Sequence, residues 1–164
     1  MNVKTGIGFD AHAFIHGRQL IIGGADIPYD RGLDGHSDAD VLTHAIIDAL
    51  AGPALGKDIG NLFPDTDPSY KNADSLKLLK NTITLMREKG WATGNVDAEI
   101  IAQAPKMAQH IPLMTEKLSD AIGIPAEDIS IKATTTEHLG FTGRKEGIAA
   151  LAVALIYRLT GGDK

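Results

Sequence analysis

One carboxylate and two histidines have a spacing that suits metal binding. Asp10 and His12 lie two residues apart at the end of an expected strand, so alternation puts both side chains on one face. His44 lies in a segment of helical periodicity and is the candidate third ligand. Three nitrogen or oxygen ligands with one open position are typical of a catalytic zinc site. The spacing also allows a simpler interpretation, in which His44 is a hydrogen-bonded, partly buried histidine.

A metal-bound histidine normally uses its second ring nitrogen to hold a neighbouring acceptor. Asp40 and Asp48 lie four residues on either side of His44, and we predict that one of them orients its ring. Three other histidines have no comparable partners in the sequence, and we interpret them as surface or locally hydrogen-bonded residues: His16, His110 and His138.

Two further segments suit a phosphorylated ligand. His36 and Ser37 stand just before an expected helix, where free backbone N–H groups and the helix dipole favour an anion. Ser37 is equally compatible with an ordinary N-cap. The stretch from Asp58 to Asp67 is rich in turn formers and carboxylates, which indicates either a binding loop or a solvated turn.

The second half of the chain carries weaker signals of the same kind. Lys106 follows a strand and is a candidate phosphate contact, although a lone lysine is usually solvated. Thr134 and Glu137 fit a capping box, but Gly140 soon interrupts any helix. Hydroxyls and a carboxylate at a strand end can instead bind phosphate oxygens and a divalent cation.

Composition limits the classes of protein that are possible. The 164 residues predict a single domain over positions 1–164, with a net charge of −5 and no basic stripe for nucleic acid. Cysteine is absent, which excludes thiolate ligands and thiol nucleophiles. Neither a signal peptide nor a membrane span is expected. We therefore expect a cytoplasmic protein, or a mature organellar one.

Hydrophobic periodicity predicts the elements that must position these residues. Strands are expected at 3–10, where Gly6 and Gly8 weaken the pattern, at 96–102 and at 129–133, and a hairpin at 20–27. Helices are expected at 37–50, stopped by Gly52 and Pro53, then at 74–89, 111–122 and 147–159, with a long loop at 56–70. The last helix is apolar on nearly every side, which is typical of a buried helix. Interleaved strands and helices indicate an α/β sandwich.

Six motifs in order give the chain a family resemblance. They are GFDAHAF, IIGG, GHSDADVLTHA, KDIGNLFPDTDP, NVDAEIIAQAPKM and IKATTTEHLGFTGRKEGIAA. Together they span nearly the whole chain, and they closely resemble the 2-C-methyl-D-erythritol 2,4-cyclodiphosphate synthase family. The resemblance implies an α/β (α+β) sandwich with one mixed β-sheet, helices packed on one face, and assembly as a homotrimer with active sites between subunits.

The resemblance also implies a reaction. The 2-phosphate of 4-diphosphocytidyl-2-C-methyl-D-erythritol 2-phosphate attacks the β-phosphorus of its own diphosphate, and CMP leaves. This is a cyclising phosphorus–oxygen lyase step of non-mevalonate isoprenoid biosynthesis. No protein nucleophile is needed, because the nucleophile belongs to the substrate. Catalysis then depends on orientation and on neutralising phosphate charge.

Matching the motifs residue by residue implies the following site. Zn²⁺ is held by Asp10, His12 and His44, and Glu137 binds a second cation, Mg²⁺ or Mn²⁺, at the diphosphate. His36 and Thr135 stabilise the transition state. Substrate contacts come from the zinc ligands and from Ala11, His36, Ser37, Asp58, Ile59, Gly60, Phe63, Pro64, Asp65, Thr66, Asp67, Ala102, Gln103, Ala104, Pro105, Lys106, Met107, Ala108, Thr134, Thr135, Thr136, Glu137, Phe141 and Arg144.

Departures from the family pattern are small. Ala11 fills a position where a bulkier apolar residue is common, and Asp34 adds negative charge near the phosphate site. Two other functions remain open from the sequence. One is a zinc phosphohydrolase that activates water with the same triad, and the other is a non-catalytic trimeric module that binds a nucleotide or a prenyl diphosphate.

Overall fold

The computed structural model describes residues 2–64 and 66–160. The strands are β1 (Val3–Ile15), β2 (Leu20–Ile22), β3 (Ala25–Ile27), β4 (Gly32–Leu33), β5 (Trp91–Ile101), β6 (Ile129–Thr134) and β7 (Gly147–Arg158). Five of them form one sheet in the order β4-β1-β7-β5-β6, and β2 pairs with β3 in the predicted hairpin. Only the β5–β6 pairing within the five-stranded sheet is parallel, so the sheet is mixed as expected.

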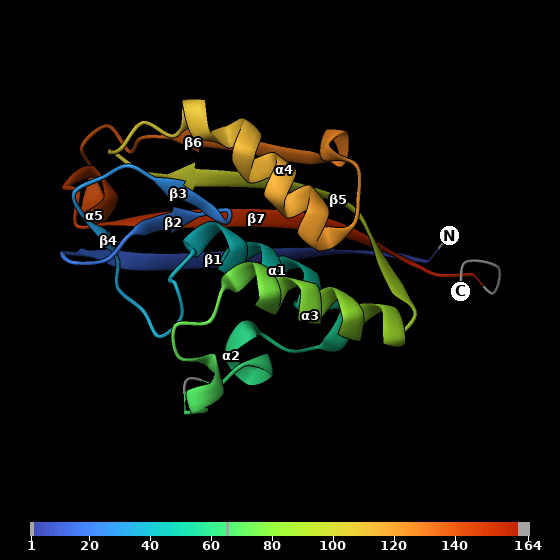
Figure 1. Cartoon of the computed structure of the whole chain (residues 1–164). Helices are drawn as coiled ribbons and strands as arrows, with labels where there is room; N and C mark the ends of the chain where they lie inside the picture. Colours follow the sequence, from blue (N-terminus) through green and yellow to red (C-terminus); the bar gives the residue numbers. More distant parts are fainter. Residues whose placement is uncertain (1, 65, 161–164) are drawn as a thin grey trace.

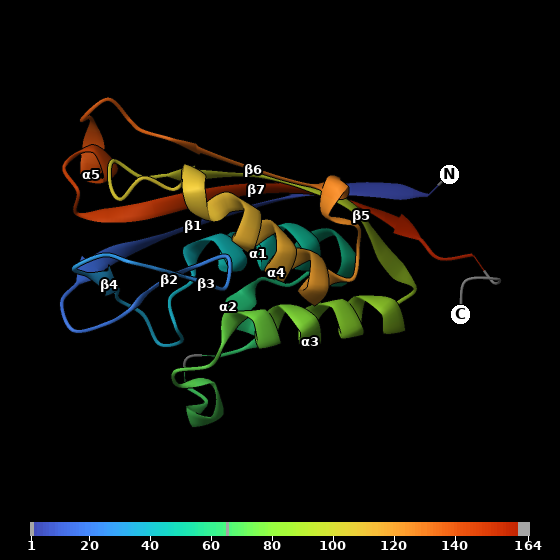
Figure 2. The same cartoon turned by 45° about the horizontal axis from the view of Figure 1, so that its top comes forward.

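Helices cover one face of this sheet (Figures 1 and 2). They are α1 (Val41–Leu55), α2 (Ile59–Leu62), α3 (Ser75–Glu88), α4 (Ile111–Ile122) and α5 (Gly140–Gly143), with 3-10 turns at Pro68–Tyr70, Ala108–His110 and Ala126–Asp128. The α+β architecture with helices on one face is therefore confirmed. Among the described residues, none of the helices has the length and apolar character needed to cross a membrane.

The predicted final helix is wrong, because residues 147–158 form strand β7 at the centre of the sheet. Strand β7 is bonded to β1 on one edge and to β5 on the other. Apolar residues occupy both faces of β7. Those that face the helices are buried, and several side chains on the opposite face have at least half of their surface buried. Such a strand has no alternating pattern, and periodicity cannot separate it from a buried helix.

Helix α1 also differs from its prediction at both ends. It begins at Val41, after an N-cap at Asp40, rather than at Ser37. It continues through Gly52 and Pro53 to Leu55, and Gly56 follows it in the left-handed conformation of a helix C-cap. The other predicted elements are found where periodicity placed them, with β1 and β5 longer than predicted and short helical turns within the loop at 56–70. Strand β4 and helix α5 were not predicted.

Gly6 and Gly8 are where α1 packs directly on β1. A Cβ atom at Gly8 would lie 1.9 Å from the carbonyl oxygen of Ala45, and one at Gly6 would lie 1.9 Å from that of Ala49. Real atoms cannot approach so closely, so only glycine permits this contact. The two glycines that weaken the strand pattern in the sequence therefore set the distance between helix and strand.

We expect Gly8→Ala to lower the free energy of unfolding by about 1–3 kcal/mol, because its methyl group forces α1 away from β1. Gly52→Ala is the matched control, because Gly52 lies in α1 itself and a Cβ atom there would meet open space. There alanine is expected to stabilise by about 0.5–1 kcal/mol. Urea unfolding of both variants measures the difference, and equal stabilities would contradict the packing argument.

Candidate metal centre and active-site pocket

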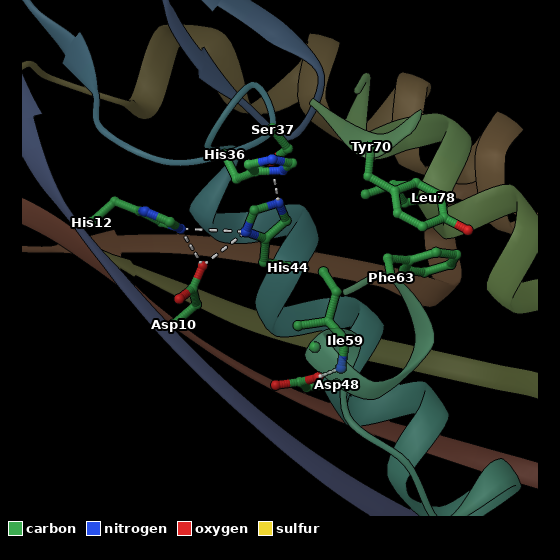
Figure 3. A pocket seen from close by; sticks show the side chains of 11 residues that line it. Asp10, His12, His36, Ser37, His44, Asp48, Ile59, Phe63, Tyr70 and Leu78 are labelled. Atoms are coloured by element: carbon green, nitrogen blue, oxygen red, sulfur yellow. Dashed lines mark hydrogen bonds and ion pairs between the residues drawn. The ribbon is translucent and has the colours of Figure 1, made fainter. Parts of the chain in front are cut away.

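The three predicted ligands converge at one point (Figure 3). Asp10 and His12 lie on the helix-facing side of β1, and His44 lies in the first turns of α1. The Asp10 Oδ2 atom is 2.8 Å from His12 Nε2 and 3.0 Å from His44 Nδ1, and the two ring nitrogens are 3.3 Å apart. The close α1–β1 contact makes this convergence possible.

The charges around this cluster favour a cation. Burial by itself raises the pKa of the Asp10 carboxyl, but hydrogen bonds with His12 and His44 outweigh it and hold that pKa well below its usual range. Burial lowers the pKa of the His12 imidazole, and the Asp10 carboxylate outweighs this and raises it. One anionic oxygen therefore has two ring nitrogens beside it, in a largely buried position. This oxygen and nitrogen donor set fits a divalent metal such as zinc.

Backbone and hydroxyl groups orient the two rings. The His12 Nδ1 atom is 2.6 Å from the carbonyl oxygen of Asp34, so its N–H donates there and Nε2 faces the cluster. The His44 Nε2 atom lies 2.9 Å from Ser75 Oγ and 3.1 Å from Ser37 Oγ. The prediction that Asp40 or Asp48 orients His44 is therefore wrong.

Asp40 has a different role, in the buried connection between the hairpin and α1. Its carboxylate accepts hydrogen bonds from the backbone N–H groups of Gly23 and Gly24 and from both the N–H and hydroxyl of Thr43, at 2.7–3.0 Å. Complete burial raises its pKa despite these bonds. Asp40 is the N-cap of α1, so the helix is not capped by Ser37.

Asp48 joins α1 to the neighbouring helix α2. Its Oδ1 atom accepts the backbone N–H of Ile59 at 2.7 Å, and burial raises its pKa. Asp58 caps α2 by accepting the N–H of Asn61, also at 2.7 Å. The stretch expected to form a binding loop is thus anchored at its start by two carboxylates.

A pocket of about 210 Å³ opens beside the cluster. One end is polar and the other apolar, and Figure 3 shows the triad and Ile59 facing it from different elements. The lining residues are Asp10, His12, His36, Ser37, His44, Asp48, Ile59, Gly60, Phe63, Tyr70 and Leu78. The sequence did not single out Tyr70 and Leu78, because an apolar residue in a helix and a tyrosine in a loop carry no motif.

Two neighbours hold the segment that carries His36 and Ser37. Arg18 donates through its guanidinium to the carbonyl oxygens of Gly35 and Ser37. The backbone N–H of Asn72 donates to the carbonyl of His36 at 2.8 Å. His36 and Ser37 are thereby fixed at the polar end of the pocket.

The predicted substrate residues fall into two groups. Ile59, Gly60 and Phe63 line the pocket, whereas Ala11, Asp58, Pro64, Thr66 and Asp67 lie outside its lining and Asp65 lies outside the described residues. The second group comes from the ends of β5 and β6, the segments that follow them, and α5, and does not line this pocket: Ala102, Gln103, Ala104, Pro105, Lys106, Met107, Ala108, Thr134, Thr135, Thr136, Glu137, Phe141 and Arg144.

This second group has its own local contacts. The Thr135 hydroxyl donates to the Glu137 carboxylate at 3.0 Å, and Arg144 pairs with Glu146 at 2.8 Å. The backbone N–H of His138 donates to Gln103 Oε1 at 3.1 Å, which links the segment after β6 to the segment after β5. These residues form a separate, mostly exposed cluster.

The comparison with protein families decides where the chain belongs. The model of the YgbB family matches residues 3–157. The chain belongs to the YgbB family. Relatives named 2-C-methyl-D-erythritol 2,4-cyclodiphosphate synthase include a protein of Geotalea daltonii, 60% identical over 95% of this chain and 91% of its own length. Another, from Bacteroides fragilis, is 55% identical over 97% of this chain and 100% of its own length.

Solved structures with the same fold also match the chain. The bifunctional IspDF from Campylobacter jejuni matches with a TM-score of 0.92 and 42% identity, over 96% of this chain and 43% of that longer one. IspF of Plasmodium falciparum, solved as a CDP complex, matches with a TM-score of 0.83 and 32% identity, over 97% of this chain and 98% of its own.

We expect zinc to stabilise the protein through the triad. At ~100 times its dissociation constant, the ion adds about 2.7 kcal/mol to the free energy of unfolding of a protein that binds it only when folded. His12→Ala is expected to abolish most of this gain, and His16→Ala, which changes an exposed histidine, is expected to keep it. Unfolding with and without zinc measures the effect. An equal gain in both variants would contradict the assignment.

Proposed function

We propose that this chain converts 4-diphosphocytidyl-2-C-methyl-D-erythritol 2-phosphate to CMP and 2-C-methyl-D-erythritol 2,4-cyclodiphosphate, the product for which its relatives are named. The observation that carries the proposal is the pocket that joins the Asp10, His12 and His44 cluster to a second, apolar end. Residues 1–164 act as one catalytic domain. By analogy with its bacterial relatives, the enzyme works in the cytoplasm.

The pocket's charge supports a metal-dependent reaction on phosphates. Asp10 and Asp48 line it, and its described lining contains no lysine or arginine. A diphosphate would be repelled there unless a cation supplied the opposing charge. Asp10, His12 and His44 would hold a divalent ion, Zn²⁺ in our proposal, which would polarise phosphate oxygens and stabilise the charge that develops on them.

The chain's own residues position the substrate for an internal displacement. An oxygen of the 2-phosphate forms a bond to the β-phosphorus, the bond from that phosphorus to the bridging oxygen breaks, and CMP leaves with that oxygen. His36 and Ser37 hold the reacting phosphates at the polar end, and the backbone of Asp58, Ile59 and Gly60 borders the erythritol. Phe63 and Leu78 exclude water from the apolar end. Orientation of this kind is worth up to about 7–11 kcal/mol.

The cytidine and the second cation belong to the separate cluster at the ends of β5 and β6. Strand register places Asp10 level with Ala150, Ile100 and Ala133 in successive strands. Three strand spacings separate β1 from β6, which is about 14 Å. We therefore propose that Thr135, and Glu137 with its Mg²⁺ or Mn²⁺, complete the site of a neighbouring subunit rather than that of their own chain.

An uncovered sheet face supports this assembly. Large apolar side chains of β1 and β7 are exposed on the side that carries no described helix: Val3, Ile7, Phe9, Val153 and Tyr157, with 40–69% of each accessible. A contiguous apolar patch of this kind marks an association surface. We propose a homotrimer, in which cyclic closure covers this face on every copy.

We expect the protein, loaded with zinc and magnesium, to release CMP and form a cyclic diphosphate from the proposed substrate. Phosphorus NMR of the product distinguishes this from its alternatives. A linear 2,4-bisphosphate with CMP would identify a phosphohydrolase, and binding without CMP release would identify a binding module. His44→Ala is expected to lower turnover more than ~100-fold with its fold retained, and His16→Ala to match the wild type.

Sites shared between subunits predict complementation. We expect His44→Ala and Glu137→Ala to be inactive alone, because each removes one half of every site. After joint refolding at equal amounts, up to about a quarter of the sites receive both intact halves. Activity of the mixture measures this. If each chain held a whole site, mixing would restore nothing, and sedimentation would then reveal whether the assembly itself is absent.

A further inference from the structure

The second ring nitrogen of His44 points away from the metal cluster, into a buried group of hydroxyls. Its Nε2 atom lies 2.9 Å from Ser75 Oγ and 3.1 Å from Ser37 Oγ. Ser75 has no accessible surface, and Ser37 is 8% exposed. Ser75 is the first residue of α3 and is not part of any motif that the proposed reaction uses.

Asp38 fixes the direction of the hydrogen bond between Ser75 and His44. The Ser75 hydroxyl donates to Asp38 Oδ1 in a very close contact, and the Ser75 backbone N–H donates to Asp38 Oδ2 at 3.0 Å. A carboxylate only accepts, and a serine hydroxyl has one proton to give. Ser75 Oγ must therefore accept from His44 Nε2, which has to carry the proton.

This proton count determines which nitrogen is available to a metal. With Nε2 protonated, Nδ1, the atom 3.0 Å from Asp10 Oδ2, is the ring nitrogen that can offer a lone pair to a metal. Ser37 Oγ accepts the N–H of Ala39 at 3.2 Å and shares the same Nε2 proton. The hydroxyl proton of Ser37 is then left to donate to an acceptor in the pocket that this residue lines.

We propose that Ser75 and Asp38 are positioning residues for the metal ligand His44. They hold the imidazole as its Nε2–H tautomer and aim Nδ1 at the metal, an inference that rests on the metal centre of the proposed function. Acceptors of this kind behind metal-bound histidines typically contribute 10–100-fold in metal affinity. Because Ser75 begins α3, directly after the stretch that borders the pocket, the same contact ties that wall to the metal ligand.

Metal affinity provides the first test. Ser75→Ala, studied in the intact protein by competition with a chromogenic chelator, is expected to weaken zinc binding by about 10–100-fold. Ser119→Ala is the matched control, because it removes a serine hydroxyl whose hydrogen bond to the carbonyl of Ile124 is remote from the pocket. It is expected to bind zinc as the wild type does.

The tautomer of His44 provides a readout that a merely structural role would not move. Nitrogen–proton NMR of the metal-free wild type and of Ser119→Ala is expected to show a proton on Nε2 of His44. A mixture of tautomers is expected in Ser75→Ala. Asp38→Asn, which keeps Ser75, is expected to show a partial shift and a loss of zinc affinity of at least about threefold, and it decides the question if Ser75→Ala does not fold.

The outcomes separate this inference from the proposed function. Failure of the wild type to bind zinc through His12 would overturn the metal centre itself. Zinc binding by the wild type, with unchanged affinity and an unchanged tautomer in folded Ser75→Ala or in Asp38→Asn, would overturn only the role of Ser75 and Asp38.

Discussion

Helix α1 rests on strand β1 with nothing but backbone between them at Gly6 and Gly8, and the position of the metal cluster depends on this contact. Two ligands come from the strand and the third from the helix, so their separation is the separation of the two elements. A single methyl group at either glycine would widen it. The ligand geometry is thus set by the absence of side chains two and four residues before Asp10.

The second constraint is the buried carboxylate of Asp40. Its four hydrogen bonds join the turn of the β2–β3 hairpin to the first turn of α1. Breaking one partner of such a buried group leaves the others without compensation, which makes it costly to change. Ser37 and His44 lie on either side of Asp40 in the chain. The hydrogen bonds of Asp40 therefore also fix the position of the His44 ring relative to the polar end of the pocket.

Much of the site was predictable, because Asp10, His12 and His44 carry their chemistry in their types and spacing. The support around them was not. Ser75 is an unremarkable serine distant in sequence, and only the fold reveals its contact with His44. The same limit explains the error over strand β7: a strand with apolar side chains on both faces lacks the alternation by which strands are recognised.

Strand β1 carries two patterns at once. Even-numbered residues such as Asp10 and His12 face the helices, and odd-numbered ones such as Ile7 and Phe9 form the bare apolar face. Because side chains alternate strictly, inserting or deleting one residue in β1 would exchange these faces. Ligands and contact surface would be lost together. A substitution in β1 therefore alters one face of the strand, whereas a change in its length would remove the metal ligands and the apolar contact surface in one step.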